Sequence, residues 1–281
     1  MTKYKIIENF LNPSDCKNLI KDAENTFDNI GNRQILNNNR ELTQSTSIKF
    51  RALLNNSKTW QELNKKISSQ QFFDKCMNDL KDYDNKFITT NFFSPKAISS
   101  QYEKYKELQL KKVGFLSSFS LLKILSFRFY LFLKRILKYK FTNKNYVELI
   151  YDYSKAQNGY KREIHRDSDA RTLIFLIYLN NLSQEATGGS LLIHEYINKN
   201  KKNIPPQPSS KDCKLIEKIQ PKEGRMVIFL NSDDSFHSVE EMINHNDYRY
   251  FIYGSFTLLG KKNPLLKSKF KKFKTEFHLF D

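Results

Sequence analysis

Two histidines and one aspartate in the second half of the chain have the types and the spacing of a metal site. His165 and Asp167 are two residues apart, and His237 follows far downstream. In an extended segment, residues i and i+2 point to the same side, so His165 and Asp167 can bind one ion together. A third ligand from a distant strand would complete one face of an octahedron. Two imidazoles and one carboxylate on a face, with the other positions open, form the ligand set of non-haem Fe(II) oxygenases.

The His-x-Asp tripeptide by itself is weak evidence, because such tripeptides arise by chance. The alternative is a surface aspartate near a core or surface histidine, with no metal ion bound between them. The neighbouring motifs favour the metal site. Around the pair the chain carries, in order, Tyr151, Tyr153, Gly159-Tyr160, Arg171, the run LIFLIYLN, Gly188-Gly189-Ser190-Leu191, Gln220 to Arg225, the run MVIFL, His237-Ser238-Val239 and Arg249.

This ordered series resembles the Fe(II)/2-oxoglutarate-dependent dioxygenase superfamily, in its prolyl-4-hydroxylase-like branch. The likeness covers about residues 146–258, and the opening KIIENFLNPSDCKNLI resembles the N-terminal strand and helix of that branch. The resemblance implies that His165, Asp167 and His237 are the catalytic iron ligands. It also implies that Arg249 binds the distal carboxylate of 2-oxoglutarate, since a guanidinium can meet a carboxylate in two parallel charge-assisted hydrogen bonds.

Tyrosine contacts to the cosubstrate are a further implication of the resemblance. Tyr153 matches the strand tyrosine that often touches 2-oxoglutarate, and Tyr151 competes for that role because it points to the same side. Phe251 stands where some relatives place a serine, two residues after the arginine. The second contact to the carboxylate must therefore come from elsewhere, with a tyrosine as the candidate.

The implied activity is hydroxylation of an unactivated C–H bond, with release of succinate and CO2. The implied cofactors are Fe(II) and O2, with 2-oxoglutarate as cosubstrate and ascorbate as a candidate reductant. Asp167 favours hydroxylation, because related halogenases carry Gly or Ala at that position. Arg166 and Arg171, close to the metal pair, favour an anionic group on the substrate. Small-molecule, sugar, lipid-linked, amino-acid and peptide substrates all stay open.

The elements that must position these residues indicate one α+β domain. Residues 1–144 are expected to be mostly helical, residues 145–259 to form a double-stranded β-helix (a jelly-roll, cupin-like barrel), and residues 260–281 to be a basic tail. Helices are predicted after Pro13, with Asn12 as the cap, and over 58–67 and 70–83. Residues 31–47 and 198–214 are expected to be loops. Short apolar runs predict strands at 3–7, 146–153, 172–179, 190–196, 215–219, 225–230 and 248–258.

The charge of the chain has two interpretations. There are 47 Lys and Arg against 30 Asp and Glu, a net charge of +17, which reflects either a genomic bias toward lysine or an anionic partner. Two basic amphipathic segments, 113–142 and 264–277, either pack on the barrel or contact an anionic membrane surface. Three scattered cysteines, no signal-peptide pattern and no apolar stretch of about 20 residues predict a cytoplasmic protein.

Other classes of protein remain as alternatives at this point. A non-catalytic binding module could use the same barrel, and a basic protein could bind a membrane surface or nucleic acid. Nucleic acid is not expected, because recognition modules are missing and Ser255 replaces the second arginine of the nucleic-acid demethylase branch. Turnover of 2-oxoglutarate without substrate would separate the enzyme from both alternatives. The oligomeric state is not indicated.

Overall fold

The computed structural model describes residues 2–30, 34–36, 39–80, 87–90, 139, 141–183, 186–198, 204–244, 247–261 and 263–266. The basic segments 113–142 and 264–277 lie almost entirely outside these residues, so packing or membrane contact through them stays a prediction. In the part of the chain that the structure describes, no helix is long and apolar enough to cross a membrane.

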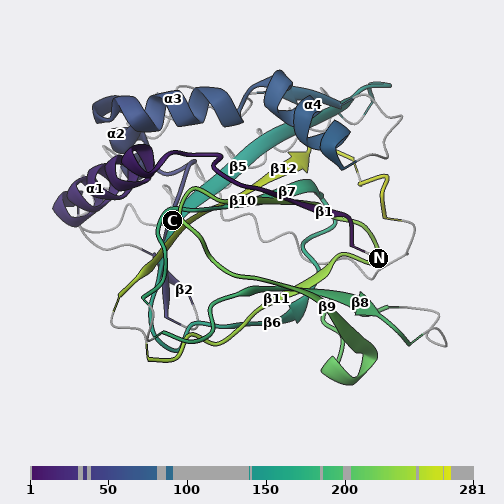
Figure 1. Cartoon of the computed structure of the whole chain (residues 1–281). Coiled ribbons are helices and arrows are strands. Elements are labelled where there is room, and N and C mark those ends of the chain that lie inside the picture. Colours follow the sequence, from purple (N-terminus) through teal and green to yellow (C-terminus); the bar gives the residue numbers. More distant parts are fainter. Residues whose placement is uncertain are drawn as a thin grey trace, which may run out of the picture.

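Two mostly antiparallel sheets face each other and enclose the interior of a barrel (Figure 1), with β4 and β5 as a parallel pair. Among the described residues, the larger sheet has the order β1-β10-β7-β12-β5-β3-β2, with β4 beside β5, and the smaller has the order β6-β11-β8-β9. The strands are β1 Tyr4–Ile7, β2 Gln34–Leu36, β3 Arg40–Gln44, β4 Phe87–Thr90, β5 Asn145–Ala156, β6 Arg162–His165, β7 Arg171–Tyr178, β8 Leu191–Tyr196, β9 Cys213–Ile219, β10 Met226–Leu230, β11 Phe236–Val239 and β12 Arg249–Leu258.

The order of the strands identifies the fold. From β5 onward, the chain passes back and forth between the sheets, with β5, β7, β10 and β12 in the larger one and β6, β8, β9 and β11 in the smaller. This is the double-stranded β-helix of jelly-roll proteins. The α+β fold with this core, expected from the sequence, is confirmed.

Four helices in the described part cover one face of the larger sheet (Figure 1). They are α1 Pro13–Ile30, α2 Ile48–Asn56, α3 Lys58–Ile67 and α4 Gln70–Asp79. Serine side chains cap the last three, since Ser47, Ser57 and Ser69 each accept a hydrogen bond from a backbone N–H three residues on. Asn12 does the same for α1 by accepting from the Asp15 N–H at 2.7 Å, as predicted.

The larger sheet therefore has two different faces. Its outer face packs against the helices through one apolar cluster, and its inner face packs against the smaller sheet through another. Strand β7 is apolar after Arg171 and Thr172, because residues of both its faces are buried. Outer-face residues include Tyr151, Tyr153, Phe175, Ile177, Ile252 and Phe256. Inner-face residues include Ala156, Ile174, Leu176, Tyr178, Phe229 and Phe251.

The prediction of a polar loop over 31–47 is wrong. Strands β2 and β3 form a hairpin, and β3 pairs with β5 so that Arg40 lies opposite Ala156. The sequence RELTQ of β3 has no apolar run to signal a strand. Its conformation is stabilised by pairing with β5, a contact between segments far apart in the chain. Helix α2 and strands β4, β6 and β11 also have no separate counterpart in the prediction.

Candidate active site

Strand pairing in the smaller sheet brings the two histidines of the predicted triad together. His165 ends β6 and is the register partner of His237 on β11. Their ring centroids are 4.3 Å apart. Asp167 follows two residues after β6, and ligand atoms of the three residues lie within 4.8 Å of one another. The structure thus assembles His165, Asp167 and His237 into a group that could hold a metal ion.

The hydrogen bonds of the triad direct its lone pairs toward one point. His165 Nδ1 lies 2.8 Å from the Glu163 carbonyl oxygen, and His237 Nδ1 lies 3.4 Å from the Ser235 carbonyl oxygen. With each Nδ1–H directed at a carbonyl, each Nε2 is left as an acceptor, as in metal-bound histidines. Asp167 Oδ2 is buried, lies 3.4 Å from His237 Nε2, and accepts no hydrogen bond from any described residue. These three donors fit a divalent cation of the Fe(II) type.

The second oxygen of Asp167 is fully engaged. Oδ1 accepts hydrogen bonds from Arg171 Nη1 at 2.6 Å and from the Tyr253 hydroxyl at 2.8 Å, and Arg171 also donates to that hydroxyl. Burial alone would raise the pKa of Asp167, but Arg171 and the two imidazoles hold the pKa well below its usual range. Asp167 is therefore an oriented carboxylate with one oxygen left for the metal.

The histidines are kept neutral by their surroundings. Burial, and secondarily the neighbouring His237, lower the pKa of His165 to about 3. Burial also lowers the pKa of His237. Because a histidine must be unprotonated to bind a metal, both rings are ready to act as ligands at neutral pH.

Arg249 occupies a sealed position on the inner face of the larger sheet. It is 0% exposed, and none of its three guanidinium nitrogens has a hydrogen-bond partner among the described residues. Its guanidinium carbon lies 5.1 Å from the ring centre of Tyr178 and 4.8 Å from that of Phe251. The buried Tyr178 hydroxyl also lacks a partner in the described part. A buried cation without a counterion is costly, so this corner is suited to a carboxylate.

Tyr178 is a functional candidate that sequence reasoning did not single out. It ends the apolar strand β7, within the run LIFLIYLN. A polar hydroxyl at the end of an otherwise apolar buried strand was the available signal. Its position beside Arg249, 5.1 Å from the guanidinium carbon to the ring centre, makes it a candidate for the tyrosine contact that the sequence analysis left unassigned.

The structure does not bring Tyr153 to the site. Tyr153 lies on the outer face, where its hydroxyl donates to Glu24 Oε1 of α1 at 2.8 Å. The competing Tyr151 also points outward and donates to Asn64 Oδ1 of α3 at 2.7 Å. The prediction that Tyr153 binds the cosubstrate is therefore wrong. The physical reason is that the alternation of β5 turns odd-numbered residues toward the helices and Asp152 and Ser154 toward the barrel interior.

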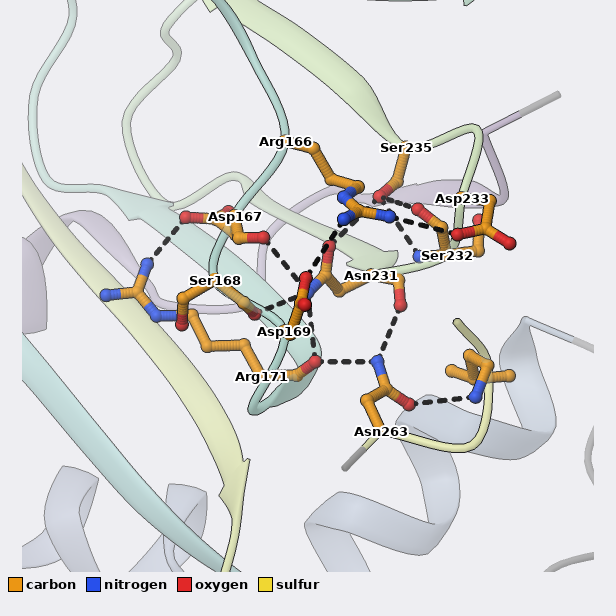
Figure 2. A network of polar contacts seen from close by, with 11 residues as sticks. Arg166, Asp167, Ser168, Asp169, Arg171, Asn231, Ser232, Asp233, Ser235 and Asn263 are labelled. Atoms are coloured by element: carbon orange, nitrogen blue, oxygen red, sulfur yellow. Dashed lines mark hydrogen bonds and ion pairs between the residues drawn. The ribbon is translucent and has the colours of Figure 1, made fainter. Parts of the chain in front are cut away.

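Arg166 also differs from the prediction. Its guanidinium is buried and paired with Asp169 at 2.9 Å and with Asp233 at 3.0 Å (Figure 2). Two carboxylates thus neutralise and hold the side chain. Arg166 joins the loop after β6 to the loop before β11, and contributes no free charge to the metal side of the site.

Two asparagines tie the same loops together, as Figure 2 shows. The Asn231 amide donates to the carbonyls of Ser168 at 2.8 Å and Arg171 at 3.0 Å, while its oxygen accepts from the Ser235 hydroxyl at 3.2 Å. The Asn263 amide donates to the carbonyls of Arg171 and Asn231, both at 2.7 Å. The segment that carries Asp167 and the turn that leads to His237 therefore share one hydrogen-bond network.

Comparison with known proteins addresses the same region. Residues 149–256 match the family model described as the 2OG-Fe(II) oxygenase superfamily. No curated protein has a sequence that matches the chain.

Similar solved structures include three prolyl hydroxylases. A Pseudomonas putida prolyl-4-hydroxylase is 13% identical with a TM-score of 0.44, over 92% of this chain and 94% of that chain. A Trichoplax adhaerens prolyl hydroxylase in complex with a hypoxia inducible factor peptide is 14% identical with a TM-score of 0.43, over 91% and 83%. A viral collagen prolyl hydroxylase from Paramecium Bursaria Chlorella virus-1, in a 2OG complex, is 14% identical with a TM-score of 0.38, over 90% and 95%. Residues 149–256, which carry the triad and Arg249, are thus similar to the 2OG-Fe(II) oxygenase superfamily, whose members use Fe(II), 2-oxoglutarate and O2.

Proposed function

We propose that the protein hydroxylates an unactivated C–H bond of its substrate, with conversion of 2-oxoglutarate and O2 to succinate and CO2. One observation carries the proposal. Among the described residues, the same barrel interior holds an unpartnered carboxylate oxygen beside two neutral imidazoles, and a buried guanidinium without a counterion. The first group fits a divalent metal, and the second fits the far carboxylate of a dicarboxylic cosubstrate.

Each protein group has a distinct task in this proposal. His165, Asp167 and His237 would hold Fe(II), which supplies the oxidising chemistry when bound with O2 and 2-oxoglutarate. Arg249 would bind the distal carboxylate of the cosubstrate, and the Tyr178 hydroxyl would donate a second hydrogen bond to it. Because Asp167 occupies a ligand position as an ionised carboxylate, hydroxylation is favoured over halogenation.

Aromatic rings close the proposed cosubstrate pocket against water. Phe251 and Tyr178 flank Arg249, and Phe229 packs on the His237 ring with centroids 4.8 Å apart. An apolar lining lowers the local dielectric and strengthens the contact between the guanidinium and a carboxylate.

Ascorbate as a reductant stays a prediction, as do the residue limits assigned to the parts of the single domain.

Succinate formation from 2-oxoglutarate, measured with Fe(II) in air and without added substrate, tests the proposal. His237→Ala should abolish both succinate formation and tight Fe(II) binding, because two remaining ligands hold a labile divalent ion poorly. His194→Ala is the matched control, since His194 is also buried in the smaller sheet but interacts with the Ser238 hydroxyl at 2.8 Å. Succinate formation by His237→Ala at the parental rate, or none by the parental protein, would contradict the proposal.

A further inference from the structure

Besides Arg249, an arginine from the N-terminal part of the chain, Arg40, enters the barrel interior. Arg40 of β3 lies opposite Ala156, and Ala156 lies opposite Arg249, so the three residues form one row across the larger sheet. The Arg40 guanidinium carbon lies 5.0 Å from the ring centre of Phe251. Since Arg249 lies 4.8 Å from the same ring, Phe251 is a shared neighbour of both guanidiniums.

Arg40 lies close to a residue that contacts a proposed metal ligand. Its guanidinium carbon is 5.9 Å from the ring centre of Tyr253, the residue whose hydroxyl donates to Asp167. Arg171 approaches the same ring at 5.2 Å. Tyr253 is therefore flanked by two arginines and hydrogen-bonded to a proposed metal ligand.

The three arginines differ in their access to solvent. Arg249 is 0% exposed, whereas the side chains of Arg40 and Arg171 are 12% and 33% exposed. A molecule that enters the site after the cosubstrate can thus reach Arg40 and Arg171.

Both accessible arginines keep unused donors. Arg40 donates through Nε and Nη2 to the Ser154 hydroxyl, at 3.0 and 2.7 Å, and through Nη2 to Asp152 Oδ1 at 2.6 Å. Arg171 uses Nη1 for Asp167 and Tyr253. No described residue accepts a hydrogen bond from Arg40 Nη1 or from Arg171 Nε and Nη2.

Over the metal, the cosubstrate, Arg249, Asp167, Arg40, Arg171 and Asp152, the charges of the proposed complex would sum to +1. Fe(II) and Arg249 together would balance Asp167 and the two carboxylates of 2-oxoglutarate. Asp152 would then balance one of Arg40 and Arg171, and it is ion-paired with Arg40 at 2.6 Å. Because charges with little access to water are normally paired, a further anion beside the two guanidiniums would be favourable.

We infer that the substrate carries a compact anion, a carboxylate or a phosphate, that Arg40 and Arg171 bind beside the metal ligands. This inference rests on the proposed function. The substrate anion takes the open donors of both guanidiniums, and the rings of Phe251 and Tyr253 line the adjoining wall. Arg40 is thereby a specificity-determining residue contributed by the N-terminal hairpin, outside the stretch 149–256.

The test is calorimetric titration of the anaerobic protein, loaded with Fe(II) and 2-oxoglutarate, at constant ionic strength. Acetate and inorganic phosphate are the anionic probes, and acetamide is the neutral counterpart of acetate. Acetate or phosphate should bind and acetamide should not, and the tighter anion identifies the group on the substrate. Arg40→Met should weaken the binding of that anion by about ten- to a hundredfold.

Two further variants separate binding from folding. Asp152→Asn should strengthen anion binding, because it removes the carboxylate that competes for Arg40, whereas a purely structural ion pair predicts no gain. Lys155→Met is the control, since Lys155 forms a similar 2.8 Å ion pair with Glu24 on the outer face, with its side chain 15% exposed. It should leave anion binding unchanged.

The inference is overturned if acetamide binds as well as acetate, if neither anion binds, or if Arg40→Met and Asp152→Asn bind the anion like the parental protein. Succinate formed in the absence of substrate by the parental protein would show that the proposed function survives that failure. Loss of this turnover in the parental protein would refute the proposed function instead.

Discussion

The outer and inner faces of the larger sheet are built from the same strands but serve different purposes. On the outer face, aromatic rings pack edge to face, as in Phe50 against Trp60 with centroids 5.2 Å apart. The polar tips there are satisfied, since Trp60 Nε1 donates to the Leu19 carbonyl at 2.9 Å and Tyr153 to Glu24. On the inner face, Arg249 and the Tyr178 hydroxyl lack partners among the described residues.

The contrast separates stability from binding. Trp60 and Tyr153 on the outer face have their hydrogen-bond partners without a ligand. The contacts of this face therefore stabilise the fold whether or not a ligand is bound. The inner face carries buried polar groups that have no partner among the described residues, so part of its free energy should be realised when a ligand binds. A substitution on the outer face should therefore change the free energy of unfolding, and one on the inner face should change an affinity.

Trp60→Ala should have the largest effect on stability. Trp60 is 0% exposed and packs against both Phe50 and Tyr153. Loss of the indole should lower the free energy of unfolding by about 3–5 kcal/mol. Denaturant titration measures this, and the 2-oxoglutarate requirement of the folded fraction should be unchanged. A shifted requirement would show that the two faces are coupled.

Arg249→Leu should change the binding of 2-oxoglutarate and should not lower the stability of the fold. The apparent affinity for 2-oxoglutarate should fall about ten- to a hundredfold, because a charge-assisted contact to a carboxylate is lost. The ligand-free protein should melt at the same temperature or higher, since a buried unpartnered cation has been removed. A lower melting temperature together with an unchanged 2-oxoglutarate titration would reverse our assignment of this residue.

Asn231→Ala should have a smaller effect. It should weaken metal binding by loosening the hydrogen bonds that hold the two loops together. Its amide links the Asp167 segment to the turn that precedes His237. Metal affinity should fall about tenfold, as for other groups that orient metal ligands. Ser232→Ala is a suitable comparison, because Ser232 contributes only backbone groups to this network. Equal metal affinities of the two variants would remove Asn231 from the positioning role.

Tyr153→Phe should have the smallest effect. It removes one hydrogen bond to Glu24 and leaves the ring in place, so the free energy of unfolding should fall by about 0.5–1.5 kcal/mol. The 2-oxoglutarate titration should match that of the parental protein. A weakened 2-oxoglutarate affinity in this variant would mean that Tyr153 acts at the site, as its place in the motif order had suggested.

Local spacing determined the parts of the site that sequence reasoning identified correctly. His165 and Asp167 are close in the chain, and the order of motifs through His237 and Arg249 indicated the superfamily that the family comparison supports. The apolar runs of β7 and β10 likewise predicted strands, since burial on both faces produces an unbroken apolar pattern. These features depend on residues that are neighbours in the sequence, or on the order in which the motifs follow one another.

Tertiary structure alone decided which way the remaining side chains face. A strand alternates its faces with a period of two, so a shift of one residue exchanges the sides, and sequence alone does not set that register. Tyr153 consequently lies against the helices, and Asp152 and Ser154 enter the barrel. Arg40 reaches them only because the polar strand β3 pairs with β5, more than a hundred residues along the chain. That pairing depends on backbone hydrogen bonds, which every residue type except proline can donate, and so it leaves little trace in the sequence.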